Sequence, residues 1–176
     1  MTARTIVLAG APVLRTKAKK VSTFGQSVHV LVEDMFESMH RANGLGLAAP
    51  QIGVPLRVII IEMPEEVDEE GTVIAPDERY AFCNPEIIEA HGEEEDEEGC
   101  LSVPDYVGLV KRATHVTVKG QDTNGRRIRT KAEGLLARAF QHEIDHLNGT
   151  LFIDRVESQD KLRRKVPNNG PRNVEQ

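Results

Sequence analysis

The segment His142-Glu143-Ile144-Asp145-His146 carries the clearest chemical signal in the sequence. In a helix, residues four apart lie on the same face, so the imidazoles of His142 and His146 would converge on one ion. Glu143 would lie beside that face and reach a water on the ion without taking a coordination position. The pattern H-E-x-x-H therefore predicts two metal ligands and a general base on one rigid element. The competing interpretation is a helix with two chance histidines, one of them paired with a carboxylate.

Cys100 is the candidate for a third ligand. Catalytic zinc-type sites usually take three protein ligands and leave one position for water, so two histidines do not complete such a site. Cys100 lies in the compact segment Glu-Gly-Cys-Leu-Ser at 98–102. A lone cysteine is more often a small buried apolar residue than a ligand, and we expect that role for Cys83.

The segment Gly-Leu-Gly-Leu-Ala-Ala-Pro-Gln at 44–51 could also approach a ligand. Its glycines allow close contact with the backbone, and Gln51 could present an amide to a buried site. No lysine follows, as it would in a phosphate-binding loop. A tight packed turn between a helix and a strand is the commoner use of such a stretch.

Length and composition indicate one soluble domain. The chain has 176 residues, of which 39% are hydrophobic and 28% charged. Its net charge of −6 argues against nucleic acid as the main partner, so we expect no specific nucleic-acid sequence to be bound. No apolar run approaches the roughly 20 residues of a membrane helix. The apolar stretch at 5–14 is short and broken by Gly10 and Pro12, which a signal peptide would not be. Two cysteines fit a reducing cytoplasm, where we expect the protein.

The elements that must position these residues follow from periodicity and turn signals. Apolar residues at helical spacing predict a first helix over 27–41. We expect strands at 57–62 and 81–89, and an exposed loop or loose hairpin between them. The acidic run 93–98 is expected to be a solvated loop.

The second half of the chain predicts a hairpin followed by a helix. Strands at 115–119 and 127–130 flank Asn124-Gly125, a strong turn signal. The second helix is expected over 132–147, with these residues facing inward: Leu135, Leu136, Ala139, Phe140 and Ile144. The fold class is therefore α+β, with mixed or antiparallel β-sheets packed around a central helix that carries H-E-x-x-H. We expect a catalytic domain at 1–155 and a polar, flexible C-terminal tail at 156–176.

Together, the three segments resemble the signature motifs of the peptide deformylase family: G-L-G-L-A-A-P-Q, E-G-C-L-S and H-E-I-D-H, in that order. Flanking sequence extends the resemblance over about 10–155. The resemblance implies a hydrolase that removes the formyl group from the N-terminal formylmethionine of newly made polypeptides and releases formate. Its partners would be N-formylmethionyl nascent peptides.

The resemblance also implies roles for the site residues. Cys100, His142 and His146 would hold one divalent metal, natively Fe²⁺, with Zn²⁺, Ni²⁺ or Co²⁺ as substitutes. Glu143 would be the general base. The backbone N–H of Leu101 and the amide of Gln51 would stabilise the charge that develops on the formyl oxygen.

By the same resemblance, Leu45 and Gly46 would line the substrate groove and pair with an extended peptide as an added strand. Leu135 and Ala139, with His142, would form the pocket for the methionine side chain.

Three further residues are named by the resemblance. Arg138 falls where some relatives have an apolar residue, so its part in that pocket is left open. Glu98 and Arg112 match positions that pair in relatives and would brace the metal loop.

Three other interpretations remain open from sequence alone. A zinc-dependent peptidase would share H-E-x-x-H but would take a third ligand downstream, where the tail after Arg155 has no His or Cys. A structural metal site would need a fourth protein ligand. A Cys–His hydrolase would use Cys100 as a nucleophile without metal. Separately, the basic run at 161–165 suggests the hypothesis of transient docking near ribosomal RNA, where nascent chains emerge.

Overall fold

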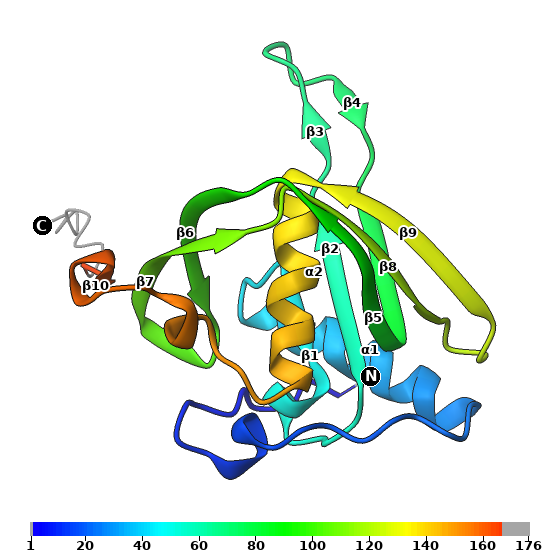
Figure 1. The fold of residues 1–176 in the computed structure, drawn as a ribbon. Helices are drawn as coiled ribbons and strands as arrows, with labels where there is room; N and C mark the ends of the chain where they lie inside the picture. Colours follow the sequence, from blue (N-terminus) through cyan, green and yellow to red (C-terminus); the bar gives the residue numbers. More distant parts are fainter. Residues whose placement is uncertain (1, 167–176) are drawn as a thin grey trace, which may run out of the picture.

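The computed structural model describes residues 2–166. Figure 1 shows the helix α2 (Gly134–Leu147) between two sheets. One is a five-stranded sheet with the strand order β1-β2-β5-β8-β9, in which every neighbouring pair is antiparallel. Its strands are β1 (Gly46–Ala48), β2 (Val58–Met63), β5 (Glu78–His91), β8 (His115–Gln121) and β9 (Arg127–Glu133). The expected α+β class with antiparallel sheets is confirmed.

The second sheet carries the turn at residues 100–102, which begins with Cys100 and is called the cysteine loop below. It is antiparallel and has the order β10-β7-β6, with β6 (Glu94–Cys100), β7 (Val103–Arg112) and β10 (Leu162–Arg164). A third apolar cluster lies beneath it and includes Cys100, Val110, Leu151 and Phe152. The cysteine loop thus joins two strands of a sheet that has its own small core.

Strand β2 separates the two larger apolar clusters. Ile59 and Ile61 belong to the cluster that contains α2, whereas Val58 and Ile60 belong to the cluster that contains α1 (Gln26–Arg41). Successive strand side chains point to opposite faces, so a sheet covered on both sides needs a continuous apolar run. This explains why Val-Ile-Ile-Ile reads as an unbroken β-branched stretch.

The expected elements at 27–41, 57–62, 81–89, 115–119 and 127–130 are confirmed, with shifts at their ends. The second helix begins at Gly134 and not at 132, because Ala132 still pairs with Val116 in β9. The stretch expected as a loop or loose hairpin contains the short hairpin of β3 (Glu66–Val67) and β4 (Val73–Ala75), which projects from the body in Figure 1.

The expectation of a solvated loop at 93–98 was wrong. Most of this run is strand β6, which pairs with β7 from Glu94 to Cys100. The carboxylates of residues 94–97 are exposed, whereas Glu98 turns inward and is 6% exposed. Acidic composition alone could not show which carboxylate faces the core.

After the short helix η3 (Phe152–Arg155), the chain continues through η4 (Gln159–Lys161) into β10. The domain boundary after residue 155 stays a prediction, and residues 167–176 of the predicted tail lie outside the described residues. Within residues 2–166, no helix has the length and apolar character to cross a membrane.

Candidate metal centre and active site

Cys100, His142 and His146 come together at the end of β6 and on α2. One ligand-type atom from each residue lies within 4.8 Å of the others, and Cys100 Sγ is 3.4 Å from His146 Nε2. In the part of the chain that the structure describes, this is the one such group of His, Cys, Asp and Glu residues. A thiolate and two imidazoles suit a divalent transition metal, so the donor set fits the predicted ion.

Glu98 fixes the orientation of the first histidine. Its Oε2 accepts a hydrogen bond from His142 Nδ1 at 2.9 Å, which leaves Nε2 of that ring free to face an ion. Burial alone would raise the pKa of Glu98, but hydrogen bonds from Arg112 and His142 overcome that effect and hold the pKa at about 2. The carboxylate is therefore ionised at neutral pH, and a hydrogen bond to such an anion increases the basicity of the other nitrogen of His142.

Two arginines hold Glu98 from the other side. Arg112 donates from Nε and Nη2 at 2.7 and 2.9 Å, as the sequence resemblance predicted. Arg138 donates from Nη1 at 3.0 Å and also binds the carbonyl oxygens of Val110 and Glu94. The sequence left open whether Arg138 takes part in the methionine pocket. In the structure it is buried, and its side chain binds Glu98. Its spacing of four from His142 on one helix was the signal that could have indicated this.

Asp145, the fourth residue of H-E-x-x-H, has a partner network of its own that the sequence did not reveal. It accepts from Arg112 Nη1 at 2.7 Å and from Arg155 Nη2 at 2.7 Å. Arg112 therefore bridges β7 to both Glu98 and the metal-motif helix. The charges form one connected chain from the surface at Arg155 to His142.

Glu143 is buried beside these three candidate ligands. Its Oε2 has no hydrogen-bond partner within residues 2–166. Burial raises the pKa of Glu143 to about 7, which suits a general base or acid near neutral pH. Burial also drives the pKa of His146 well below its usual value, so that ring is neutral, as a ligand must be.

Gln51 faces the cysteine loop from the short helix η2 (Ala49–Ile52). Its Oε1 accepts from the Ala48 N–H at 2.9 Å, so its Nε2 points to Ser102 Oγ at 3.2 Å and Cys100 Sγ at 3.6 Å. The N-terminal segment ties both sides together, because Val7 N–H bonds the Gln51 carbonyl and Ala9 N–H bonds that of Ser102.

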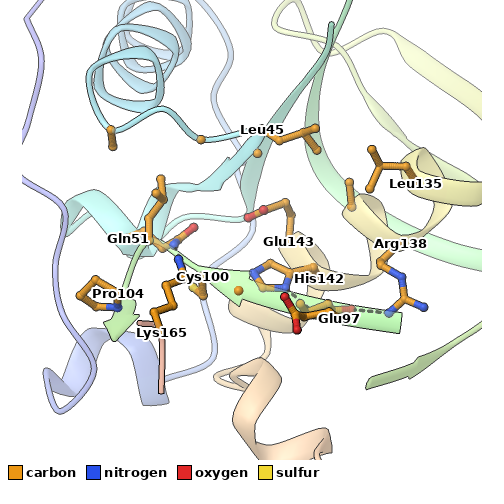
Figure 2. A pocket seen from close by; sticks show the side chains of 17 residues that line it. Leu45, Gln51, Glu97, Cys100, Pro104, Leu135, Arg138, His142, Glu143 and Lys165 are labelled. Carbon is orange, nitrogen blue, oxygen red and sulfur yellow. Dashed lines mark hydrogen bonds and ion pairs between the residues drawn. The ribbon is translucent and has the colours of Figure 1, made fainter. Parts of the chain in front are cut away.

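A cavity of about 450 Å³ opens over these groups. Figure 2 shows Leu45, Gln51, Cys100, Leu135, Arg138, His142 and Glu143 around it. Gly46, Leu101 and Ala139 also line it, so nine of the ten predicted site residues share this cavity. The tenth, His146, is buried behind them at 1% exposure. Leu135 does not face the core as expected; it is 54% exposed and forms part of the cavity wall.

The family model described as polypeptide deformylase matches residues 3–162. The chain belongs to the peptide deformylase family. The peptide deformylase of Thermomicrobium roseum is 47% identical over 163 residues, which is 93% of this chain and 91% of that protein. That of Halothermothrix orenii is 51% identical over 147 residues, 84% of this chain and 89% of the relative.

Solved structures agree with this assignment. The peptide deformylase from Legionella pneumophila superposes with a TM-score of 0.79 at 47% identity, covering 91% of this chain and 89% of that one. A Met-Ala-Ser-bound peptide deformylase from Acinetobacter baumannii gives 0.79 at 36% identity, covering 88% and 99%. The chain is a metal-dependent hydrolase of the peptide deformylase type, so the peptidase, structural-metal and Cys–His interpretations are set aside.

Proposed function

We propose that the N-formyl group of formylmethionyl nascent peptides is hydrolysed in this cavity to formate and a free N-terminus. Each of the ten predicted site residues would have the role given below. The observation that carries the proposal is the convergence of Cys100, His142 and His146 with a buried carboxylate, Glu143, beside them. Three ligands leave one coordination position for water or substrate, as catalytic sites require.

Cys100, His142 and His146 would hold one divalent ion. A bound ion there would lower the pKa of a water molecule and polarise the formyl oxygen. We propose Fe²⁺ as the native ion, with Zn²⁺, Ni²⁺ or Co²⁺ as substitutes, since affinity order alone does not select among them. Glu98 supports the choice of ligand atom on His142 through its bond to Nδ1.

Glu143 would move the proton. Its unpartnered Oε2 can accept a proton from the attacking water, and a pKa of about 7 allows the same group to return it to the leaving amine nitrogen. One buried carboxyl group can therefore act first as base and then as acid.

Gln51 and Leu101 would stabilise the negative charge that develops on the formyl oxygen. The Gln51 amide is held by Ala48 and Ser102, so its N–H is oriented before the substrate arrives. The Leu101 N–H follows the ligand cysteine directly. Preorganised donors of this kind are often worth about 3 kcal/mol each in the transition state.

The peptide would bind along β1. This strand lies at the edge of the five-stranded sheet, so its outer side can accept an extended chain next to Leu45 and Gly46. Leu135 and Ala139 supply apolar surface on the α2 side of the cavity for the methionine side chain. The tripeptide in the Acinetobacter baumannii structure, Met-Ala-Ser, has the sequence that deformylation of formyl-Met-Ala-Ser would leave.

Formate release from formyl-Met-Ala-Ser tests the proposal. We expect anaerobically prepared protein to release formate, to lose activity on chelation, and to regain it when Fe²⁺ is restored. Glu143→Ala should lower kcat by at least about 100-fold while metal content is retained. No release from folded, metal-loaded protein would refute the proposal.

We also propose that the reaction takes place in the cytoplasm with transient ribosome association. Two free cysteines suit a reducing compartment. In the basic run, Lys161 and Arg163 pair with Glu95 and Glu97, whereas Arg164 has no ion pair among the described residues. Unchanged ribosome co-sedimentation of Arg164→Gln would refute a role for this side chain in docking.

A further inference from the structure

The last described strand brings a cation to the active-site cavity. β10 pairs with β7 through Leu162–Gly108, Arg163–Val107 and Arg164–Tyr106. The Lys165 N–H then bonds the Asp105 carbonyl oxygen at 2.8 Å, which continues the pairing by one residue. The position of Lys165 is therefore fixed by the same sheet that carries the cysteine loop.

Contacts on both sides anchor this strand. Leu162 packs against the apolar cluster beneath the sheet, and Arg163 bonds Glu97 of β6 at 2.6 Å. Lys161 bonds Glu95 at 2.6 Å. Alternation along the extended backbone places the side chains of Arg163 and Lys165 on the same face of the sheet, the face on which Arg163 meets Glu97 of β6.

Lys165 lines the cavity beside Gly99 and Cys100. A Cβ built on Gly99 would lie 3.7 Å from Lys165 Nζ, so the ammonium stands close to the residue that precedes the ligand cysteine. The carboxylates near Lys165 form ion pairs with other residues: Glu97 pairs with Arg163, and Glu98 pairs with Arg112 and Arg138. Within residues 2–166, Lys165 has no ion pair.

We propose that Lys165 is a specificity residue whose ammonium binds a carboxylate side chain of the peptide substrate, in the first two residues after formylmethionine. The inference rests on the proposed deformylation. In Figure 2, Lys165 and Leu135 lie on opposite sides of Cys100 and His142. With the methionine side chain against Leu135 and the peptide backbone beside β1, the next residues extend away from Leu135. The cavity wall at Gly99 carries Lys165, a cation without an ion pair among the described residues.

An extended chain advances about 3.3 Å per residue, so the second residue after methionine lies roughly 7 Å from it. The flexible side chain of Lys165 can adjust to an acidic side chain at either the first or the second residue after formylmethionine. Because Lys165 is exposed, the effect should be moderate and salt-sensitive: about a two- to fivefold change in KM.

The test compares peptides that differ only in charge. We would measure kcat and KM on the full, metal-loaded chain with C-terminally amidated formyl-Met-Ala-Ser, formyl-Met-Asp-Ser, formyl-Met-Ala-Glu and formyl-Met-Lys-Ser. Amidation removes the terminal carboxylate, which would otherwise bind the same cation. We expect a lower KM for the two acidic peptides, with the difference narrowing at high salt.

Substitutions assign that preference to one side chain. Lys165→Arg should retain it, Lys165→Met should abolish it, and Lys165→Glu should favour the lysine-containing peptide. Lys119→Met, on β8 and outside the cavity, is the matched control and should keep the preference. Equal KM values for all peptides in the unsubstituted chain, or a preference that persists in Lys165→Met, would overturn the inference. Absence of formate from every peptide would instead refute the deformylation itself.

Discussion

The carboxylate of Glu98 binds the imidazole of His142 with one oxygen, 2.9 Å from Nδ1, and is held by two arginines through the rest of its hydrogen bonds. Glu98 is a buried anion, with the proposed metal ligand His142 on one side and Arg112 and Arg138 on the other. The orientation of a proposed ligand thus depends on three residues outside the proposed ligand set.

Replacing Glu98 by Gln should weaken metal binding. The neutral amide keeps the size but loses the charge that makes His142 a better donor, and such outer partners typically change metal affinity by about 10- to 100-fold. Competition with a chelator of known affinity measures this directly. Glu97→Gln is the matched control, because Glu97 is exposed on the same strand and, among the described residues, forms an ion pair with Arg163 alone. Equal metal affinities for the two variants would contradict the assigned role.

Arg112 and Arg138 should contribute unequally to the stability of the fold. Arg112→Met leaves Glu98 and Asp145 without their shared cation, and breaking a buried pair in this way costs about 3–5 kcal/mol. Arg138→Met leaves Glu98 still paired with Arg112 but removes the donor to the Val110 carbonyl. This loss should lower the free energy of unfolding by about 1–3 kcal/mol. Denaturant unfolding of the metal-free proteins should therefore rank Arg112→Met as the less stable variant. The reverse order would mean that Arg138 is the principal support of Glu98.

The N-terminal segment offers a pH-dependent test of stability. Asp34 on α1 accepts from the Thr2 N–H at 2.8 Å and from Arg4, and these bonds hold the pKa of Asp34 below its ordinary value of 3.8. A carboxyl whose pKa is lowered by folding stabilises the native state above the unfolded pKa, and this contribution disappears as the pH falls through the folded pKa.

Asp34→Asn should therefore lower the melting temperature at pH 7 by roughly 3–6 °C, for a loss of about 1–2 kcal/mol, and by progressively less below pH 4. Thermal unfolding followed from pH 7 to pH 3 tests this. Glu37→Gln is the control on the same helix, because its exposed pair with Arg41 should contribute little at any pH. A deficit in Asp34→Asn that stays constant down to pH 3 would contradict the assignment.

The sequence predicted most of the site but little of what supports it. His142 and His146 were predicted from helical spacing. Cys100 was a candidate from its loop, and only the resemblance made it an expected ligand, because a single cysteine has no spacing of its own to interpret. The hairpin around Asn124-Gly125 was equally clear, since its turn chemistry and strand alternation agree.

The parts that local pattern missed depend on pairing between distant segments. Glu98 was named only through the resemblance, because it is one of several carboxylates in an acidic run and its inward position depends on its pairing opposite Gly108 in β7. Arg138 and Arg155 are ordinary cations until that carboxylate and Asp145 are placed beside them. Leu135 follows the helical stripe, yet α2 turns it to the cavity. Strand register and helix rotation are tertiary properties that local pattern does not encode.

Gly46 should be essential for the position of the proposed base. A Cβ built on this residue would lie 2.6 Å from Glu143 Oε1 and 3.1 Å from its Cδ, which is closer than real contacts allow. Because Gly46 of β1 is paired with Ile61 of β2, the backbone cannot easily retreat, so the carboxylate must move. We expect Gly46→Ala to lower kcat for formyl-Met-Ala-Ser by about 100-fold, as removal of a general base does.

A double-mutant cycle separates this explanation from a general disturbance of the groove. If Gly46→Ala acts through Glu143, adding it to Glu143→Ala should lower kcat little further, because the displaced group is already gone. If it acts by blocking the peptide along β1, the two losses should multiply and KM should rise in both backgrounds. Full additivity in kcat would therefore show that the glycine serves the substrate backbone and leaves the base where it is.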